Sequence, residues 1–259
     1  MKYLTFAIII SLTTAFALSA TAQITSGQQS TGQTAMQNAA ASGKYLFIHF
    51  WKEKNTQTDK TLKTLQTGAT KFADSADVVS LRTTDPAEKA IIDRFNVSKA
   101  PMPLILSIAP CGAVTKAFPG NLDEKQLASA FVSPCEELCM KAIQSRKMVF
   151  VCVVYEVSPD GQATIPQGVK DFQADAKYVK ATEIVTLNAA DKNEADFLKE
   201  LQINTKAQKP VSVLLAPGAL VGTFDSTVTK QQIVAKLVAL QSNPCAGGNC
   251  GPNGCGPKK

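Results

Sequence analysis

The chemistry that this sequence could perform rests on its seven cysteines. Three of them, Cys245, Cys250 and Cys255, are evenly spaced as C-x4-C-x4-C among glycine and proline near the end of the chain. Such thiolates can form disulfides or converge on a soft metal ion such as Cu(I), whereas Zn(II) would need a fourth ligand from elsewhere. The spacing leaves three interpretations open: disulfide bonding or cross-linking, metal binding, or an inert end.

The other four cysteines lie in the body of the chain. Cys135 and Cys139 are four residues apart at a predicted helix start, so they share one helix face. This spacing suits a shared metal ion or two separate partners better than a direct disulfide, and core packing competes as an interpretation of Cys139. Cys152 is expected to be buried in a strand, and Cys111 to be exposed in a hairpin turn. The odd total leaves at least one thiol free or intermolecular.

The first residues predict export, which favours disulfides. Residues 1–22 contain a lysine, an apolar stretch too short to span a membrane and the small-residue signal Ala20-Thr21-Ala22, a pattern typical of a signal peptide. Residues 23–33 are polar and small, and are predicted to be a disordered leader. No other run approaches the ~20 apolar residues of a membrane span. We therefore expect a periplasmic or secreted protein without a transmembrane segment.

Composition narrows the function further. The chain is 45% hydrophobic and has a formal net charge of +6, with lysines scattered and not interleaved with aromatic residues. This pattern argues against a nucleic-acid-binding surface. Hydrolase or transferase chemistry also lacks support, because the one histidine, His49, has no partner cluster and is expected to pack in a strand. No carboxylate pair has a telling spacing.

One segment of the chain occurs twice. Residues 77–99 align without a gap with residues 183–205, at an offset of 106. Each copy is followed by a strand that opens on proline and by a capped helix. The chain is therefore predicted to be a tandem repeat of one strand-helix-strand-strand-helix unit, each preceded by a leading helix.

Capping patterns mark where the helices of this unit begin. Asp85 and Glu88 predict an N-cap and its capping box, and Asp191 and Glu194 repeat that pattern in the second copy. The expected elements are helices over 35–42 and from Thr58, Asp85, Asp123, Ser133, Asp191 and Thr229, a helix over 166–179, and strands over 45–51, 78–82, 103–108, 148–155 and from Pro210. The domains are then 34–132 and 133–241, followed by a disordered tail over 242–259 that is rich in Cys, Gly and Pro.

This order of elements resembles the thioredoxin fold. The run SGKYLFIHFWKEKN from Ser42 is similar to the entry of exported thioredoxin-like domains. Pro103 and Pro210 fall where that family has its cis-proline, and Pro101 competes in the first unit. The resemblance implies an α/β protein of two tandem thioredoxin-like domains, each a central mixed sheet flanked by helices.

The resemblance also implies a Cys-x-x-Cys motif where the first strand of a unit enters its helix. Those positions hold Asn55, Thr56, Gln57 and Thr58, and Thr58 is predicted to be the helix N-cap. In the second unit the stretch over 156–166 contains no cysteine. Neither asparagine nor threonine can form a mixed disulfide, so the family's oxidoreductase activity is not expected here.

Two functional hypotheses remain. The first is an exported, redox-inactive binding or scaffold protein whose partner is a protein or peptide, with a retained peptide groove and a plain scaffold both open. The alternative is thiol-disulfide or metal handling through the tail cysteines, where Zn(II) or Cu(I) would be the ion. No other cofactor is indicated, and the sequence does not specify the oligomeric state.

Overall fold

The structure is a computed structural model that describes residues 29–120, 122–155 and 165–242. The predicted signal peptide, most of the predicted leader and nearly all of the predicted tail lie outside these residues. Within them, no helix is long and apolar enough to cross a membrane.

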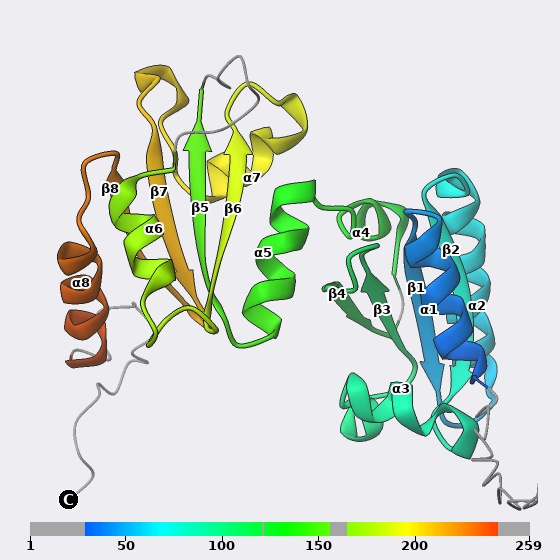
Figure 1. Cartoon of the computed structure of the whole chain (residues 1–259). Coiled ribbons are helices and arrows are strands. Elements are labelled where there is room, and N and C mark those ends of the chain that lie inside the picture. The colour runs from blue at the N-terminus through cyan, green and yellow to red at the C-terminus, as the bar shows by residue number, and fades with distance from the viewer. Residues whose placement is uncertain (1–28, 121, 156–164, 243–259) are drawn as a thin grey trace, which may run out of the picture.

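The chain forms two units with the same order of elements (Figure 1). The first comprises α1 (Thr31–Ala41), β1 (Tyr45–Trp51), α2 (Thr56–Ala69), β2 (Ala76–Arg82), α3 (Lys89–Arg94), β3 (Leu104–Ile108), β4 (Val114–Pro119) and α4 (Glu124–Ala128). The second comprises α5 (Pro134–Gln144), β5 (Met148–Val154), α6 (Gln167–Ala174), β6 (Thr182–Asn188), α7 (Ala195–Glu200), β7 (Val211–Ala216), β8 (Ala219–Asp225) and α8 (Lys230–Ser242). The first unit ends with α4, and the second begins with α5.

Each unit is built on a four-stranded mixed sheet. The orders are β2-β1-β3-β4 and β6-β5-β7-β8, and in both the central strand runs parallel to one neighbour and antiparallel to the other. Residues of α1 and α3 pack on one face of the first sheet, and residues of α2 and α4 on the other. In the second unit α5 and α7 cover one face, and α6 and α8 the other. The two apolar faces explain why β1 and β5 are continuous hydrophobic runs.

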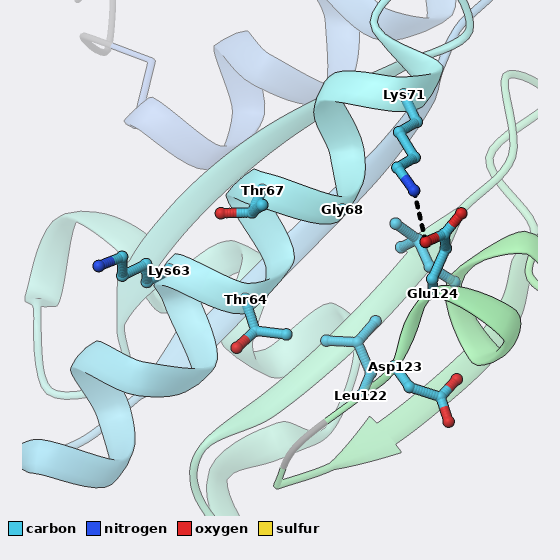
Figure 2. Close-up of a pocket in the computed structure, with 9 residues that line it drawn as sticks. Lys63, Thr64, Thr67, Gly68, Lys71, Leu122, Asp123 and Glu124 are labelled. Carbon is cyan, nitrogen blue, oxygen red and sulfur yellow. Dashed lines mark hydrogen bonds and ion pairs between the residues drawn. The ribbon is translucent and has the colours of Figure 1, made fainter.

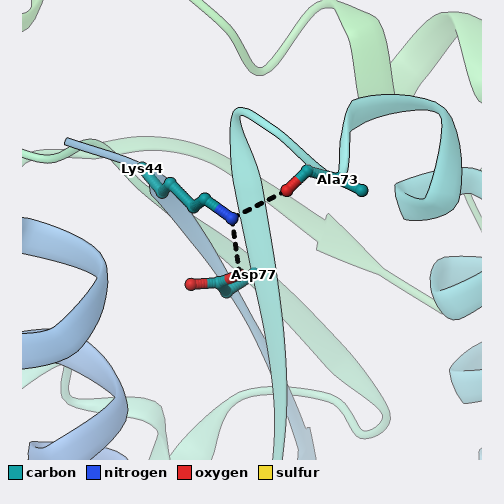
Figure 3. Close-up of polar contacts among 3 residues, drawn as sticks. All are labelled: Lys44, Ala73 and Asp77. Carbon is teal, nitrogen blue, oxygen red and sulfur yellow. Dashed lines mark hydrogen bonds and ion pairs between the residues drawn. The ribbon is translucent and has the colours of Figure 1, made fainter. Parts of the chain in front are cut away.

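An ion pair is repeated at the start of both sheets. Lys44, just before β1, lies 3.5 Å from the carboxylate of Asp77 on β2 and donates to the carbonyl of Ala73 (Figure 3). Lys147, just before β5, lies 2.6 Å from the carboxylate of Glu183 on β6. These pairs are partly exposed, so each contributes at most about 1 kcal/mol, and the two units have them at corresponding places.

The repeated glutamates differ from the expected capping boxes. Asp85 and Asp191 do cap, each accepting an N–H two residues ahead at the start of a short 3-10 turn. Glu88, however, is buried and accepts the backbone N–H of Gly32 in the first turn of α1 at 3.1 Å. The expectation was wrong because the carboxylate serves the leading helix of the unit, which lies next to it in space.

The second unit repeats this arrangement. Buried Glu194 accepts the N–H of Cys135 at 3.0 Å and the hydroxyl of Ser133, both at the start of α5. A carboxylate at a helix N-terminus satisfies donors that the helix cannot pair and interacts favourably with the helix dipole. The same contact therefore ties the leading helix to the α3 or α7 segment in both units.

The leading helix starts earlier than the sequence analysis expected. Residues 31–33 belong to α1 and not to the leader, because Ser30 and Gln33 form a capping box. The backbone at Gly32 lies close to its neighbours: a Cβ there would be 2.7 Å from both Glu88 Oε2 and Leu81 Cδ1. In the second unit, α6 ends at Ala174 and not at Val179 as expected, because the backbone of Asp175 is extended.

Removing a buried carboxylate should destabilise its unit strongly. Glu88→Ala leaves the buried Gly32 N–H without its hydrogen-bond acceptor. We therefore expect the free energy of unfolding to fall by about 1–3 kcal/mol. The control is Asp93→Ala on α3, which removes an exposed pair with Lys89 and should cost at most about 1 kcal/mol. Urea unfolding measures both, and equal losses would contradict the role assigned to Glu88.

Candidate functional site

The end of β1 is where the fold would place thioredoxin-type chemistry. Trp51 is partly exposed there, and the guanidinium of Arg82 lies 5.5 Å from the centre of its ring. The N–H of Thr83 donates to the Trp51 carbonyl at 2.7 Å, and Arg82 Nε donates to the Lys52 carbonyl at 3.4 Å. The end of β2 therefore holds the loop that leads into α2.

The loop enters α2 through an asparagine cap. Asn55 Oδ1 accepts the backbone N–H of Thr58 at 2.9 Å, so Asn55, and not Thr58 as predicted, is the N-cap. Thr58 lies one turn further on, is buried, and donates its hydroxyl to the Glu53 carbonyl at 2.9 Å. The prediction failed because both residue types cap well and only the backbone geometry distinguishes them.

At the start of α2, the side-chain oxygens of Asn55 and Thr58 are both engaged in hydrogen bonds to the backbone. Asn55, Thr56 and Gln57 are exposed, and none of them or Thr58 carries a thiol or an ionisable group. The N-terminus of a helix can lower the pKa of a cysteine and make it a nucleophile, but here the N–H of the fourth position is taken by an amide oxygen. Hydrogen bonds hold the start of α2, and none of these four side chains could attack a disulfide.

A cis-proline lies beside this loop. Among the described residues, the Met102–Pro103 peptide is the one cis bond. Of the two candidates in the first unit, Pro103 and not Pro101 is therefore the cis-proline. Pro103 is buried and precedes Leu104, which pairs with Phe50 near the end of β1. The register therefore places Pro103 at the same end of the sheet as Trp51.

The corresponding candidate in the second unit is wrong. The Lys209–Pro210 peptide is not cis, and Pro210 is exposed. The chain enters β7 differently there, because Gln208 turns it in the left-handed region (φ 47°) after a 3-10 turn. Residues 156–164, between β5 and α6, lie outside the described residues, so the structure describes a thioredoxin-type loop in the first unit alone.

His49 is a packed strand residue, as predicted. It is fully buried on the same sheet face as Phe47, and its Nδ1 lies 3.0 Å from Ser80 Oγ, while Nε2 has no hydrogen-bond partner. Burial lowers the pKa of His49 to about 4, so the ring is neutral at physiological pH. The ring is fully buried, and no group of three or more His, Cys, Asp or Glu side chains that could hold a metal ion is found among the described residues.

Among the described residues, the four cysteines of the body form no disulfide, and burial raises the pKa of each thiol. Burial raises the pKa of Cys135 to about 12, with the charge of Glu194 adding to it, and raises the pKa of Cys139 to about 12. Burial also raises the pKa values of Cys111 and Cys152. These thiols stay protonated at neutral pH, which makes them poor nucleophiles.

Cys135 and Cys139 pack against the same hydrophobic core of the second unit, so core packing accounts for this pair. Cys135 donates to the Thr186 carbonyl at 3.3 Å. Cys152 is buried, as predicted, and accepts from the hydroxyl of Ser212 at 3.5 Å. Within the described residues, no group of three or more His, Cys, Asp or Glu side chains is placed to hold a metal ion. Cys245, Cys250 and Cys255 lie outside those residues.

Cys111 corrects one expectation and introduces a contact that the sequence did not predict. It lies in the β3–β4 turn but is only partly exposed, because α5 of the second unit crosses the turn and Cys111 Sγ donates to the Glu137 carbonyl at 3.6 Å. Tyr45 at the start of β1 donates its hydroxyl to the Glu137 carboxylate, and burial raises the pKa values of both groups. The leading helix of the second unit, α5, therefore also packs against the first unit.

A cleft lies between α2 and α4, away from the Asn55 end of α2. It has a volume of about 370 Å³ and is spanned by an ion pair between Lys71 and Glu124 at 2.5 Å (Figure 2). Its floor is tight at Gly68, where a Cβ would be 2.9 Å from Leu127. Neither cysteine nor histidine lines it. The cleft offers shape and charge for a contact but no reactive group.

No protein-family model matches the sequence, and no curated protein is significantly similar to it. Among solved structures, the chain is similar to the germline-specific thioredoxin Deadhead of Drosophila melanogaster (18% identity, 39% of this chain and 90% of that one, TM-score 0.31). It is also similar to thioredoxin O2 of Arabidopsis thaliana (15%, 39% and 86%, TM-score 0.32) and to an exposed lipoprotein thioredoxin of Streptococcus pneumoniae (15%, 36% and 85%, TM-score 0.31).

The protein is an α/β protein of two thioredoxin-like units. Both units have the central mixed sheet, covered by helices on both faces, that the resemblance implies. The first unit also has the cis-proline. The fold expected from the sequence is therefore confirmed.

The buried histidine predicts how stability depends on pH. The pKa of His49 is about 4 in the fold and about 6.5 in the unfolded chain, so the unfolded chain binds more protons between these values. Its contribution to stability is thus complete above pH ~6.5 and is lost as the pH falls toward 4, by about 1 kcal/mol per pH unit. Urea unfolding of wild type and His49→Phe at pH 7 and pH 5 should show a weaker pH dependence in the variant. An unchanged dependence would contradict the neutral buried ring.

Proposed function

We propose that this protein is an exported binding or scaffold protein whose two thioredoxin-like units have no redox activity. The observation that supports this proposal most directly is the Asn55 cap of α2. The helix start that would activate a thiol has an amide oxygen on its N–H group and a buried threonine in place of a second cysteine. The raised pKa values of the four body thiols point the same way.

The binding role follows from what the site retains. Trp51 with Arg82 over its ring, the loop that Arg82 contacts, and Pro103 lie at one end of the first sheet. Aromatic rings with an adjacent cation are suited to contacts with proteins and peptides. The partner is accordingly a protein or peptide and not a nucleic acid.

Insulin reduction with dithiothreitol tests the loss of redox activity. A variant with the three tail cysteines replaced by serine should reduce insulin no faster than buffer, because a mixed disulfide needs an attacking thiolate. Adding Asn55→Cys and Thr58→Cys should create measurable activity, whereas Asn55→Ser and Thr58→Ser should not. Catalysis by the chain that carries only the tail substitutions would contradict the proposal.

The second candidate function is thiol or metal handling by the tail. The even spacing of Cys245, Cys250 and Cys255 favours it, since an inert end does not need regularly placed thiols. Exchanging all three for serine should abolish any Cu(I) or Zn(II) uptake and any disulfide-linked oligomer. It should leave the thermal midpoint unchanged. Native mass spectrometry and calorimetry of the exported protein measure these effects, and a midpoint several degrees lower would show that the tail is stapled to a domain.

A further inference from the structure

The two units treat the outer edge of their last strand differently. In the first unit, α5 lies against the edge strand β4. The carboxamide of Gln144 accepts the N–H of Val114 at 2.9 Å and donates to its carbonyl at 2.7 Å. These two bonds are the pair that a residue on a neighbouring antiparallel strand would exchange with Val114. The Gln144 side-chain amide thus makes, at the edge of β4, the two hydrogen bonds that the backbone of a further strand would make.

Register identifies the counterpart of Val114 in the second unit. In the first unit, Leu46 on β1 pairs with Ile108 on β3, and Ile108 pairs with Val114 on β4. In the second unit, Val149 on β5 pairs with Leu215 on β7, and Leu215 pairs with Leu220 on β8. Leu46 and Val149 are equivalent in the repeat, and both hairpins have a register shift at the same point. Leu220 therefore holds the position of Val114, and its N–H and carbonyl face outward from β8.

No element of the described chain covers this position. The strand β8 has β7 as its one strand neighbour, and α8 packs on a face of the sheet. The Leu220 side chain is 50% exposed and is the one large exposed hydrophobic residue among those described that lies on a strand. Within residues 165–242, no side chain is seen to fill the position at Leu220 that Gln144 fills at Val114.

The sequence of β8 carries few of the charges that keep edge strands apart: its one charged residue, Asp225, is the last of the strand. Natural edges carry charges or proline against strand-to-strand association. The edge strand β4 contains Lys116 and Pro119, and the outer strands β2 and β6 contain Asp77 and Glu183. From Ala219 to Phe224, β8 has no charged residue and no proline, so two copies aligned antiparallel place no like charges opposite each other.

We propose that two copies of this chain associate through their β8 strands, paired antiparallel about a two-fold axis. The outward N–H and carbonyl of Leu220 bond to the backbone of the other copy, and the two sheets of the second units become one eight-stranded sheet. Such an interface is self-complementary, as a two-fold contact requires. The proposal does not depend on the binding partner or on the tail.

Sedimentation equilibrium of the full chain under reducing conditions tests this association without tail disulfides. The wild type is expected to sediment as a dimer. Leu220→Lys places two like charges at the pairing edge and should give a monomer with an unchanged far-ultraviolet circular dichroism spectrum. The control is Val179→Lys, since Val179 is 49% exposed but lies outside the strands, and this variant should remain a dimer.

Hydrogen exchange gives a second, independent readout. Exchange of the Leu220 amide should slow as the protein concentration rises in the wild type, and should be independent of concentration in Leu220→Lys. A wild type that stays monomeric, or a Leu220→Lys chain that dimerises with wild-type affinity, would overturn the proposal. Either outcome leaves the redox-inactive binding role of the first unit intact, because that role rests on other residues.

Discussion

The contact on which both units depend is a buried glutamate at the start of the leading helix. The Glu88 carboxylate accepts a hydrogen bond from the backbone N–H of Gly32. The Glu194 carboxylate accepts hydrogen bonds from the backbone N–H of Cys135 and from the Ser133 hydroxyl. A buried carboxylate is costly unless hydrogen bonds satisfy it, and the unpaired N–H groups of a helix end supply them. This contact fixes the leading helix over one sheet face. It thereby sets the position of α5, which carries the second unit and also borders the first.

At the start of α2, hydrogen bonds take the place where the resemblance implies a pair of cysteines. Asn55 satisfies the helix start, Thr58 is buried beneath it, and Pro103 keeps its cis bond. The body thiols have raised pKa values through burial, and none lies at a thioredoxin-type helix start of the described chain. The described residues of the first unit therefore place a held loop, a cis-proline and Trp51 at one end of the sheet, with no thiol at the start of α2.

The repeat allowed the fold to be predicted because its apolar runs, capping aspartates and proline-led strands recur at matched positions. It did not predict where the repeated glutamates would bind, since their spacing from Asp85 and Asp191 also fits a local capping box. A serine and a glutamine at positions 30 and 33 could have revealed the true start of α1. That signal lay in a stretch whose polar composition suggested a leader. The junction between the units was beyond sequence reasoning, because Gln144 and Glu137 occur once and have no repeated counterpart.

The reactivity of the body thiols is the quantity that separates a binding protein from an oxidoreductase most directly. Alkylation rates of Cys111, Cys135, Cys139 and Cys152 can be followed against pH by peptide mass spectrometry, with glutathione as the reference thiol. Thiolate, not thiol, is the reacting form, so the rate of each residue reports its ionisation. The structure predicts that all four react more slowly than glutathione at pH 7 and gain rate only at alkaline pH. A midpoint below pH 7 at any of them would contradict a body without an activated thiol.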